Sequence, residues 1–104
     1  MPTLSTFSPL RTEIGGIEVD RLAREFGTPF YVYDAAKIEE RIAELKSFDV
    51  VRYAMKACSN LAILDLIRRE GALVDTVSGN EIRRALAAGY VVAPLTSSLA
   101  AYML

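Results

Sequence analysis

The sequence predicts an α/β fold with a parallel sheet. Short β-branched or aromatic runs alternate with amphipathic stretches of helical periodicity, and glycines or prolines separate them. A repeated strand–helix order of this kind places parallel strands side by side through right-handed crossovers. With 104 residues, the chain is long enough for one small domain. It is shorter than the roughly 250 residues that a complete (β/α)₈ barrel usually needs.

The element boundaries follow from stop signals and caps. A first helix is expected over residues 18–26, where apolar side chains recur at helical spacing before a glycine and a proline. Asn60 is a candidate N-cap for a later helix. Gly71 and Gly89 are expected to end two helices. The strands are expected over residues 30–33, 50–57 and 73–77, and the helices that follow them contain residues 38–45, 60–70 and 80–88.

Three regions are expected along the chain: an irregular segment over residues 1–15, βα units over residues 16–90, and an atypical apolar tail over residues 91–104. The tail is shorter than the ~18 apolar residues of a membrane span, and it contains Pro94. The N-terminus lacks a basic stretch followed by an apolar core, so no signal peptide is expected. These features predict a cytoplasmic protein without a membrane partner.

Composition excludes several kinds of chemistry. The formal net charge of −1 gives no electrostatic reason to expect nucleic acid as a partner. Cys58 is the only cysteine, which excludes an internal disulfide and is typical of a reducing compartment. Histidine is absent, so this chain supplies neither an imidazole base nor a histidine metal site, and no metal is expected.

Lys56 is the candidate catalytic residue. The other two lysines, Lys37 and Lys46, lie on the polar side of an expected helix, where a solvated charge is the ordinary explanation. Lys56 instead ends an expected strand, and alternation places it on the same face as Ala54. The opposite face carries the bulkier side chains Val51, Tyr53 and Met55. If helices cover that bulky face, Lys56 points the other way, at the carboxyl edge where active sites of βα barrels lie.

Two explanations of Lys56 are open on the residue alone. Partial burial at the strand end would favour the neutral amine, which is the form that reacts with an aldehyde cofactor. Alternatively, an ordinary strand-end lysine extends its ammonium group to water along its aliphatic stem. The sequence on either side of Lys56 favours the first explanation, because it resembles a known signature.

Three landmarks carry this resemblance. Residues Tyr53–Asn60 resemble the Tyr-Ala-x-Lys-Ala signature of decarboxylases that use pyridoxal 5′-phosphate (PLP) on the alanine-racemase-like barrel. Residues Val74–Ile82 are similar to the family's next landmark, Asp-x-x-Ser-x-Gly-Glu-Leu/Ile. Residues Gly27–Asp34 resemble the opening strand of the diaminopimelate decarboxylase branch of these fold-type III enzymes. The resemblance covers about Leu22 to Tyr90 and implies the first part of a parallel (β/α)₈ TIM-type barrel, incomplete in this chain.

The resemblance implies roles for three residues. The lysine that matches Lys56 holds PLP covalently in this family, and PLP is the electron sink for the loss of CO₂. Asp75 would lie near lysine and cofactor, where its carboxylate would hold the charge state and orientation of the lysine. Glu81 matches the family's acidic position and is the third cofactor-binding candidate. The simpler explanations are a local pair at the strand end for Asp75 and a first-turn carboxylate favoured by the helix dipole for Glu81.

The chain departs from the family pattern at three places. Cys58 stands where the family usually has asparagine, and a thiol forms weaker hydrogen bonds than an amide. Asn80 replaces a small residue, and asparagine is the side chain that best tolerates a positive φ if the position requires one. Residues 91–104 do not resemble the family and are expected to be a frameshifted or truncated end.

The function implied by the resemblance is the PLP-dependent decarboxylation of meso-diaminopimelate to L-lysine, the last step of lysine biosynthesis. An amino acid is then the small-molecule substrate, and a homodimer is the usual assembly of the family. Two alternatives remain open. The chain could be an inactive truncated remnant, because the family's phosphate-binding loops and C-terminal β-domain are not found in it. It could also be a small PLP-binding barrel or a related amino-acid decarboxylase or racemase.

Overall fold

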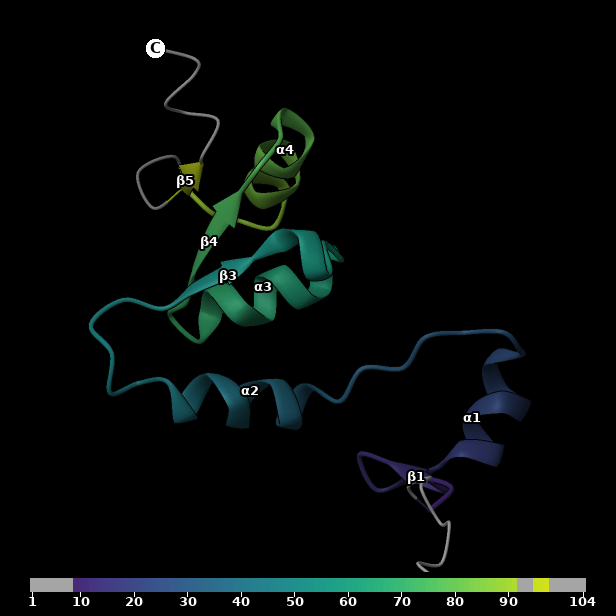
Figure 1. The fold of residues 1–104 in the computed structure, drawn as a ribbon. Helices are drawn as coiled ribbons and strands as arrows, with labels where there is room; N and C mark the ends of the chain where they lie inside the picture. Colours follow the sequence, from purple (N-terminus) through teal and green to yellow (C-terminus); the bar gives the residue numbers. More distant parts are fainter. Residues whose placement is uncertain (1–8, 92–94, 98–104) are drawn as a thin grey trace, which may run out of the picture. The chain divides into compact units, whose positions relative to one another are not determined.

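A computed structural model of the chain describes residues 9–91 and 95–97 (Figure 1). The chain divides into two compact units, Met1–Asp34 and Ala35–Leu104, and the three candidate site residues all belong to the second. Among the described residues, no helix is both long and apolar enough to cross a membrane.

The first unit opens with a short hairpin. Strands β1 (Glu13–Ile14) and β2 (Ile17–Glu18) pair in antiparallel orientation. The two connecting residues, Gly15 and Gly16, have φ angles of 59° and 79°. A two-residue hairpin loop of the favoured type needs positive φ at both positions, which glycine adopts without steric cost. The prediction of an irregular segment up to Gly15 is therefore wrong for this hairpin, whereas residues 1–8 lie outside the described part.

Helix α1 (Val19–Phe26) completes the described part of the first unit and confirms the helix expected there. Its buried residue is Leu22. The helix ends as expected at Gly27, whose φ is 77° and whose N–H donates to the carbonyl of Ala23 at 2.9 Å.

The second unit contains a three-stranded parallel sheet in the order β3-β4-β5 (Figure 1). The strands are β3 (Arg52–Ala54), β4 (Leu73–Thr76) and β5 (Leu95–Ser97). Helix α3 (Leu61–Arg69) connects β3 to β4, and helix α4 (Gly79–Ala87) connects β4 to β5. This βαβαβ order is the parallel α/β arrangement that the sequence predicts.

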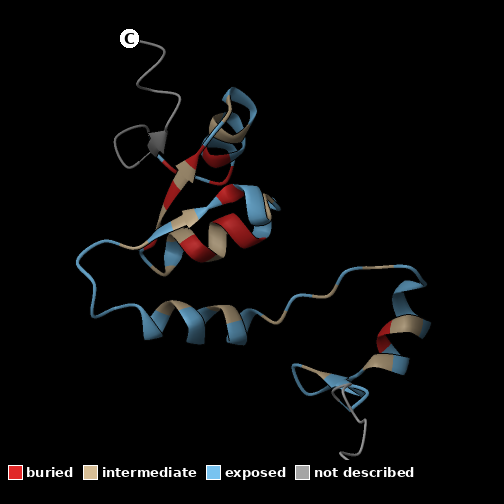
Figure 2. Cartoon of the chain, viewed as in Figure 1, coloured by how far each residue is buried: buried red, intermediate tan, exposed pale blue. Residues whose placement is uncertain are grey.

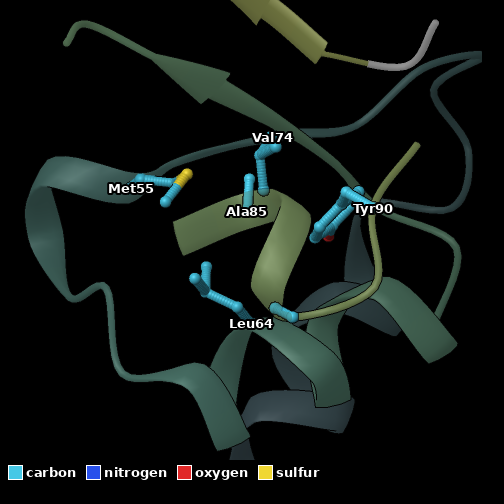
Figure 3. Packing of buried hydrophobic residues seen from close by; sticks show 6 residues of the cluster. Met55, Leu64, Val74, Ala85 and Tyr90 are labelled. Carbon is cyan, nitrogen blue, oxygen red and sulfur yellow. The ribbon is translucent and has the colours of Figure 1, made fainter. Parts of the chain in front are cut away.

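The main hydrophobic core lies between β4 and the two crossover helices. Burial is concentrated on β4, α3 and α4 (Figure 2). Side chains from separate segments converge there (Figure 3), namely Met55, Leu64, Val74, Ala85, Ala88 and Tyr90. Leu64, Val74 and Ala85 have no exposed surface. Both helices therefore cover the same face of the sheet.

A second cluster joins helix α2 (Ala35–Glu44) to this unit. Its buried members are Ile63 and Ile67 of α3, together with Ala72 before β4. The half-buried side chains that pack against it include Ile38 and Ile42, which lie four residues apart on one face of α2. The ring of Tyr53 packs against both clusters.

Helices α3 and α4 end in the same way. Gly71 and Gly89 have φ angles of 87° and 102°. The residue after each glycine donates its N–H back into the helix, from Ala72 to the Ile67 carbonyl at 3.2 Å and from Tyr90 to the Ala85 carbonyl at 3.0 Å. This is the Schellman arrangement, in which a left-handed glycine ends the helix and the two terminal apolar residues pack together. The predicted stops at both glycines are confirmed.

Three sequence predictions need correction. Residues 30–33 form no strand, and the side chain of Tyr31 is 90% exposed. The strand expected over residues 50–57 is limited to Arg52–Ala54, because the chain turns into the 3₁₀ helix η1 (Met55–Ala57). The backbone of residues 95–97, placed in the tail from the sequence, forms β5 beside β4, while residues 98–104 lie outside the described part.

Candidate functional site

Lys56 lies in η1, directly after β3 at the carboxyl end of the sheet. The preceding residue, Met55, is 1% exposed and belongs to the main core. Lys56 itself is exposed. The alternation expected from the sequence is thus confirmed up to Met55, with the bulky side chains on the helix-covered face and Ala54 exposed on the other.

Asp75 lies on the same edge of the sheet. The register of the parallel pair places Asp75 beside Ala54, two residues before Lys56, and places the backbone of Thr96 on its other side. Its neighbours Val74 and Thr76 are fully buried toward the helices, whereas Asp75 is half-buried. Since side chains alternate along a strand, Asp75 shares the face of Ala54 that α3 and α4 do not cover.

The exposure of Lys56 corrects one expectation. Partial burial of its amine was expected to favour the neutral form, but the described residues leave the side chain exposed. The physical reason is the short β3, because Lys56 follows the sheet instead of lying within it. The backbone alone therefore places Lys56 near Asp75, because Asp75 pairs with Ala54, two residues before Lys56.

Glu81 takes part in the cap of α4. Ser78 is the N-cap residue, and its Oγ accepts a hydrogen bond from the backbone N–H of Glu81 at 3.1 Å. The Glu81 Oε2 atom in turn accepts from the backbone N–H of Val77 at 3.1 Å. These two bonds resemble a capping box, which satisfies N–H groups that a helix start leaves without partners. Within the described residues, Oε1 of Glu81 is buried without a hydrogen-bond partner.

The two departures from the family signature have different structural settings. Cys58 is half-buried and packs against the second cluster. Asn80 lies within α4, and none of the described non-glycine residues has a positive φ. The Oδ1 atom of Asn80 accepts a hydrogen bond from Arg83 at 3.1 Å. The asparagine is thus accommodated by ordinary helical backbone.

Sequence reasoning missed two side chains that hold the segment after Lys56. The hydroxyl of Tyr53 donates to the carbonyl of Cys58 at 2.7 Å, and Nε of Arg84 donates to the carbonyl of Ser59 at 2.9 Å. Tyr53 belongs to the signature around Lys56, but the signature does not predict which group its hydroxyl contacts. No local spacing rule pairs Arg84 with a residue 25 positions earlier.

The described residues include groups that can bind the aldehyde end of PLP. An exposed primary amine at the carboxyl edge of a parallel sheet is accessible to an aldehyde, and a carboxylate lies in register on the adjacent strand. The orphaned Oε1 of Glu81 is a further acceptor near the end of β4. A primary amine is the group that an aldehyde cofactor such as PLP needs for covalent attachment.

Comparison with known proteins agrees with this chemistry. The family described as "Pyridoxal-dependent decarboxylase, pyridoxal binding domain" matches residues 35–97, more than half of the chain. The chain belongs to this pyridoxal-dependent decarboxylase family. The match extends past Tyr90, where the resemblance seen in the sequence ends, and includes the backbone of β5. PLP, the cofactor expected from the sequence, is the one that the family description gives.

The relatives are diaminopimelate decarboxylases. The protein of Escherichia coli (strain K12) is 57% identical over 79 residues, which are 76% of this chain and 19% of the relative. The protein of Streptomyces coelicolor is 58% identical over 81 residues, 75% of this chain and 18% of the relative. A solved structure titled "Crystal structure of diaminopimelate decarboxylase" matches with a TM-score of 0.66 and 63% identity, over 67% of this chain and 17% of that one. The chain thus spans about a fifth of the length of these relatives.

Proposed function

We propose that this protein acts in the PLP-dependent decarboxylation of meso-diaminopimelate to L-lysine, with Lys56 as the cofactor lysine. The observation that carries the proposal is the register of the sheet. It sets Asp75 beside the residue two positions before Lys56, at the carboxyl edge of the strands. The names of the relatives support diaminopimelate as the substrate.

Each proposed role belongs to a side chain of the candidate site. When bound, PLP supplies the electron sink for the loss of CO₂. Lys56 would hold the cofactor through Nζ and would accept a proton at this atom when it is not bound. The carboxylate of Asp75 stabilises the protonated amine and orients it. Glu81 contributes Oε1 as an acceptor on the cofactor side, while its Oε2 atom stays with the cap of α4.

The assembly and the location belong to the same proposal. We expect a homodimer in the cytoplasm, with a small amino acid as the substrate. Analytical ultracentrifugation tests the dimer, since a monomer at micromolar concentration refutes it.

The cofactor site is tested by trapping. The chain is incubated with PLP and reduced with borohydride, and the labelled lysines are located by peptide mass spectrometry. Saturable labelling of Lys56 well above that of Lys37 and Lys46 supports the site. Lys56→Ala should abolish the saturable component, whereas Lys37→Ala is the matched control and should retain it. Equal labelling of all three lysines refutes the site.

The reaction is tested separately. Release of CO₂ from carboxyl-labelled meso-diaminopimelate is measured with and without PLP, and ornithine and arginine serve as competing substrates. Release that depends on PLP and is lost in Lys56→Ala supports the proposed reaction. Selective labelling of Lys56 without any release refutes decarboxylation by this chain but leaves its cofactor site intact. Faster release from ornithine or arginine refutes the substrate.

A further inference from the structure

The connection that carries Lys56 is short and anchored at both ends. It runs from Ala54, the last residue of β3, to Asn60, the N-cap of α3. Met55 fixes its start in the core, and Oδ1 of Asn60 fixes its end by accepting the N–H groups of Ala62 and Ile63 at 2.9 and 3.3 Å. Between these anchors the backbone follows one 3₁₀ turn and then two half-buried residues.

Two consecutive carbonyls in this connection accept hydrogen bonds from other elements. Tyr53 of β3 reaches the carbonyl of Cys58, and Arg84 of α4 reaches the carbonyl of Ser59. Both distances, 2.7 and 2.9 Å, are those of well-formed hydrogen bonds. The donors come from opposite sides of Lys56 in the sequence, so the two bonds tie the connection both to the sheet and to the second crossover helix.

The two donors differ in setting. The ring of Tyr53 is half-buried between the two core clusters, and burial raises the pKa of its hydroxyl. The phenol therefore keeps its proton and remains a donor at neutral pH. Arg84 is exposed, and its guanidinium group offers only hydrogen-bond donors.

We propose that Tyr53 and Arg84 are positioning residues for Lys56, and that together they hold the backbone of residues 55–59 while leaving the amine of Lys56 free to move. This inference rests on the proposed function, in which Lys56 must alternate between a bound and a released state. A lysine side chain has many rotamers, so a mobile backbone would add to the positions that its amine can occupy. Fixing the backbone removes that part of the spread and keeps the amine near the cofactor aldehyde.

Two variants and two matched controls test the proposal. Tyr53→Phe removes only the hydroxyl and retains the packed ring, and Arg84→Ala removes the second donor. Tyr90→Phe is the control for the first variant, because the Tyr90 hydroxyl donates to the Ala72 carbonyl at 2.8 Å, on the far side of the core. Arg83→Ala is the control for the second, since Arg83 is exposed on the same helix and is bonded to Asn80 instead.

The first readout is amide hydrogen exchange without cofactor. Exchange in peptides covering residues 55–60 reports local opening of the connection. Tyr53→Phe is expected to raise it about threefold to tenfold, and Arg84→Ala about threefold, the ratios that follow from losing a partly buried and an exposed hydrogen bond. The two controls should leave these peptides at the wild-type rate. Unchanged exchange in Tyr53→Phe, or an equal rise in Tyr90→Phe, overturns the proposal.

The second readout is borohydride-trapped PLP at Lys56, divided by that at Lys37 in the same molecule. This ratio is expected to fall severalfold in Tyr53→Phe and to stay constant in Tyr90→Phe, even though both variants lose a hydroxyl. A constant ratio in Tyr53→Phe contradicts a role toward the cofactor. If wild-type Lys56 shows no preference, the proposed function fails, whereas hydrogen exchange still decides whether Tyr53 and Arg84 hold the connection.

Discussion

Leu64→Ala is the substitution that should most directly disrupt the second unit. Leu64 has no exposed surface, and its neighbours in the main core come from η1, β4, α4 and the segment after α4. The change removes about three carbon groups, worth roughly 2.4 kcal/mol in transfer free energy. Elements that converge from several directions cannot all move in to fill the space, so a cavity cost adds to this loss. We expect a decrease of about 3–4 kcal/mol in the free energy of unfolding.

Urea denaturation followed by circular dichroism measures this decrease, which should lower the midpoint by roughly 1–4 M. Leu61→Ala is the matched control, because Leu61 begins the same helix but is 42% exposed. It should cost about 1 kcal/mol or less. Equal midpoints for the two variants would show that the core does not pack as the structure has it.

Three further changes test individual interactions. Asn60→Ala should cost about 1 kcal/mol by removing the cap of α3, whereas Asn80→Ala, inside a helix, should cost less than half of that in the same urea titration. Burial raises the pKa of Tyr90 to about 12, above the ordinary value near 10, so the folded chain keeps this proton longer than the unfolded chain. Stability should therefore fall between about pH 10 and 12, by on the order of 2 kcal/mol, and Tyr90→Phe should lack this decrease. Glu81→Ala should lower the thermal midpoint by a few degrees, since it leaves the N–H before α4 without its acceptor, and Glu81→Gln should lower it less.

The order of the parallel unit could be predicted because its signals are local. The stops at Gly71 and Gly89 require a positive φ, and glycine is the residue that supplies it readily. The cap at Asn60 needs a side-chain oxygen just before an apolar helix, which the sequence shows directly. The hairpin at Gly15 and Gly16 gave a similar signal, a pair of glycines between two isoleucines, but strands of two residues are too short to show alternation.

The strand predicted over residues 30–33 shows where local signals mislead. Aromatic and β-branched residues favour strands because they pack on a pleated surface against neighbours. The described residues provide no paired strand there, and Tyr31 is almost fully exposed. The β-propensity of residues 30–33 therefore indicates that the segment could form a strand, but a strand forms only where a neighbouring strand pairs with it.

The sequence likewise predicted only part of the candidate site. Its family signature indicated Lys56, Asp75 and Glu81, and the register of β3 and β4 places Lys56 and Asp75 at one edge of the sheet. The sequence also predicted Glu81 as a carboxylate in the first turn of a helix, favoured by the helix dipole, but it did not predict the hydrogen bond from the N–H of Val77. The hydrogen bonds that Tyr53 and Arg84 donate to the carbonyls of Cys58 and Ser59 could not be predicted from the signature.

The reason lies in where β3 ends. Had the strand continued through residue 57 as predicted, Cys58 would lie about 16 Å along the chain from Tyr53, far beyond the reach of a tyrosine hydroxyl. The 3₁₀ turn rises only about 2 Å per residue, and it redirects the chain so that the Cys58 carbonyl returns to within 2.7 Å of that hydroxyl. The same turn places Lys56 beyond the sheet and exposes its side chain. The break in the strand therefore accounts both for the exposure of the lysine and for the hydrogen bond that holds its backbone, and a variant that lost the hydroxyl of Tyr53 would separate the two effects.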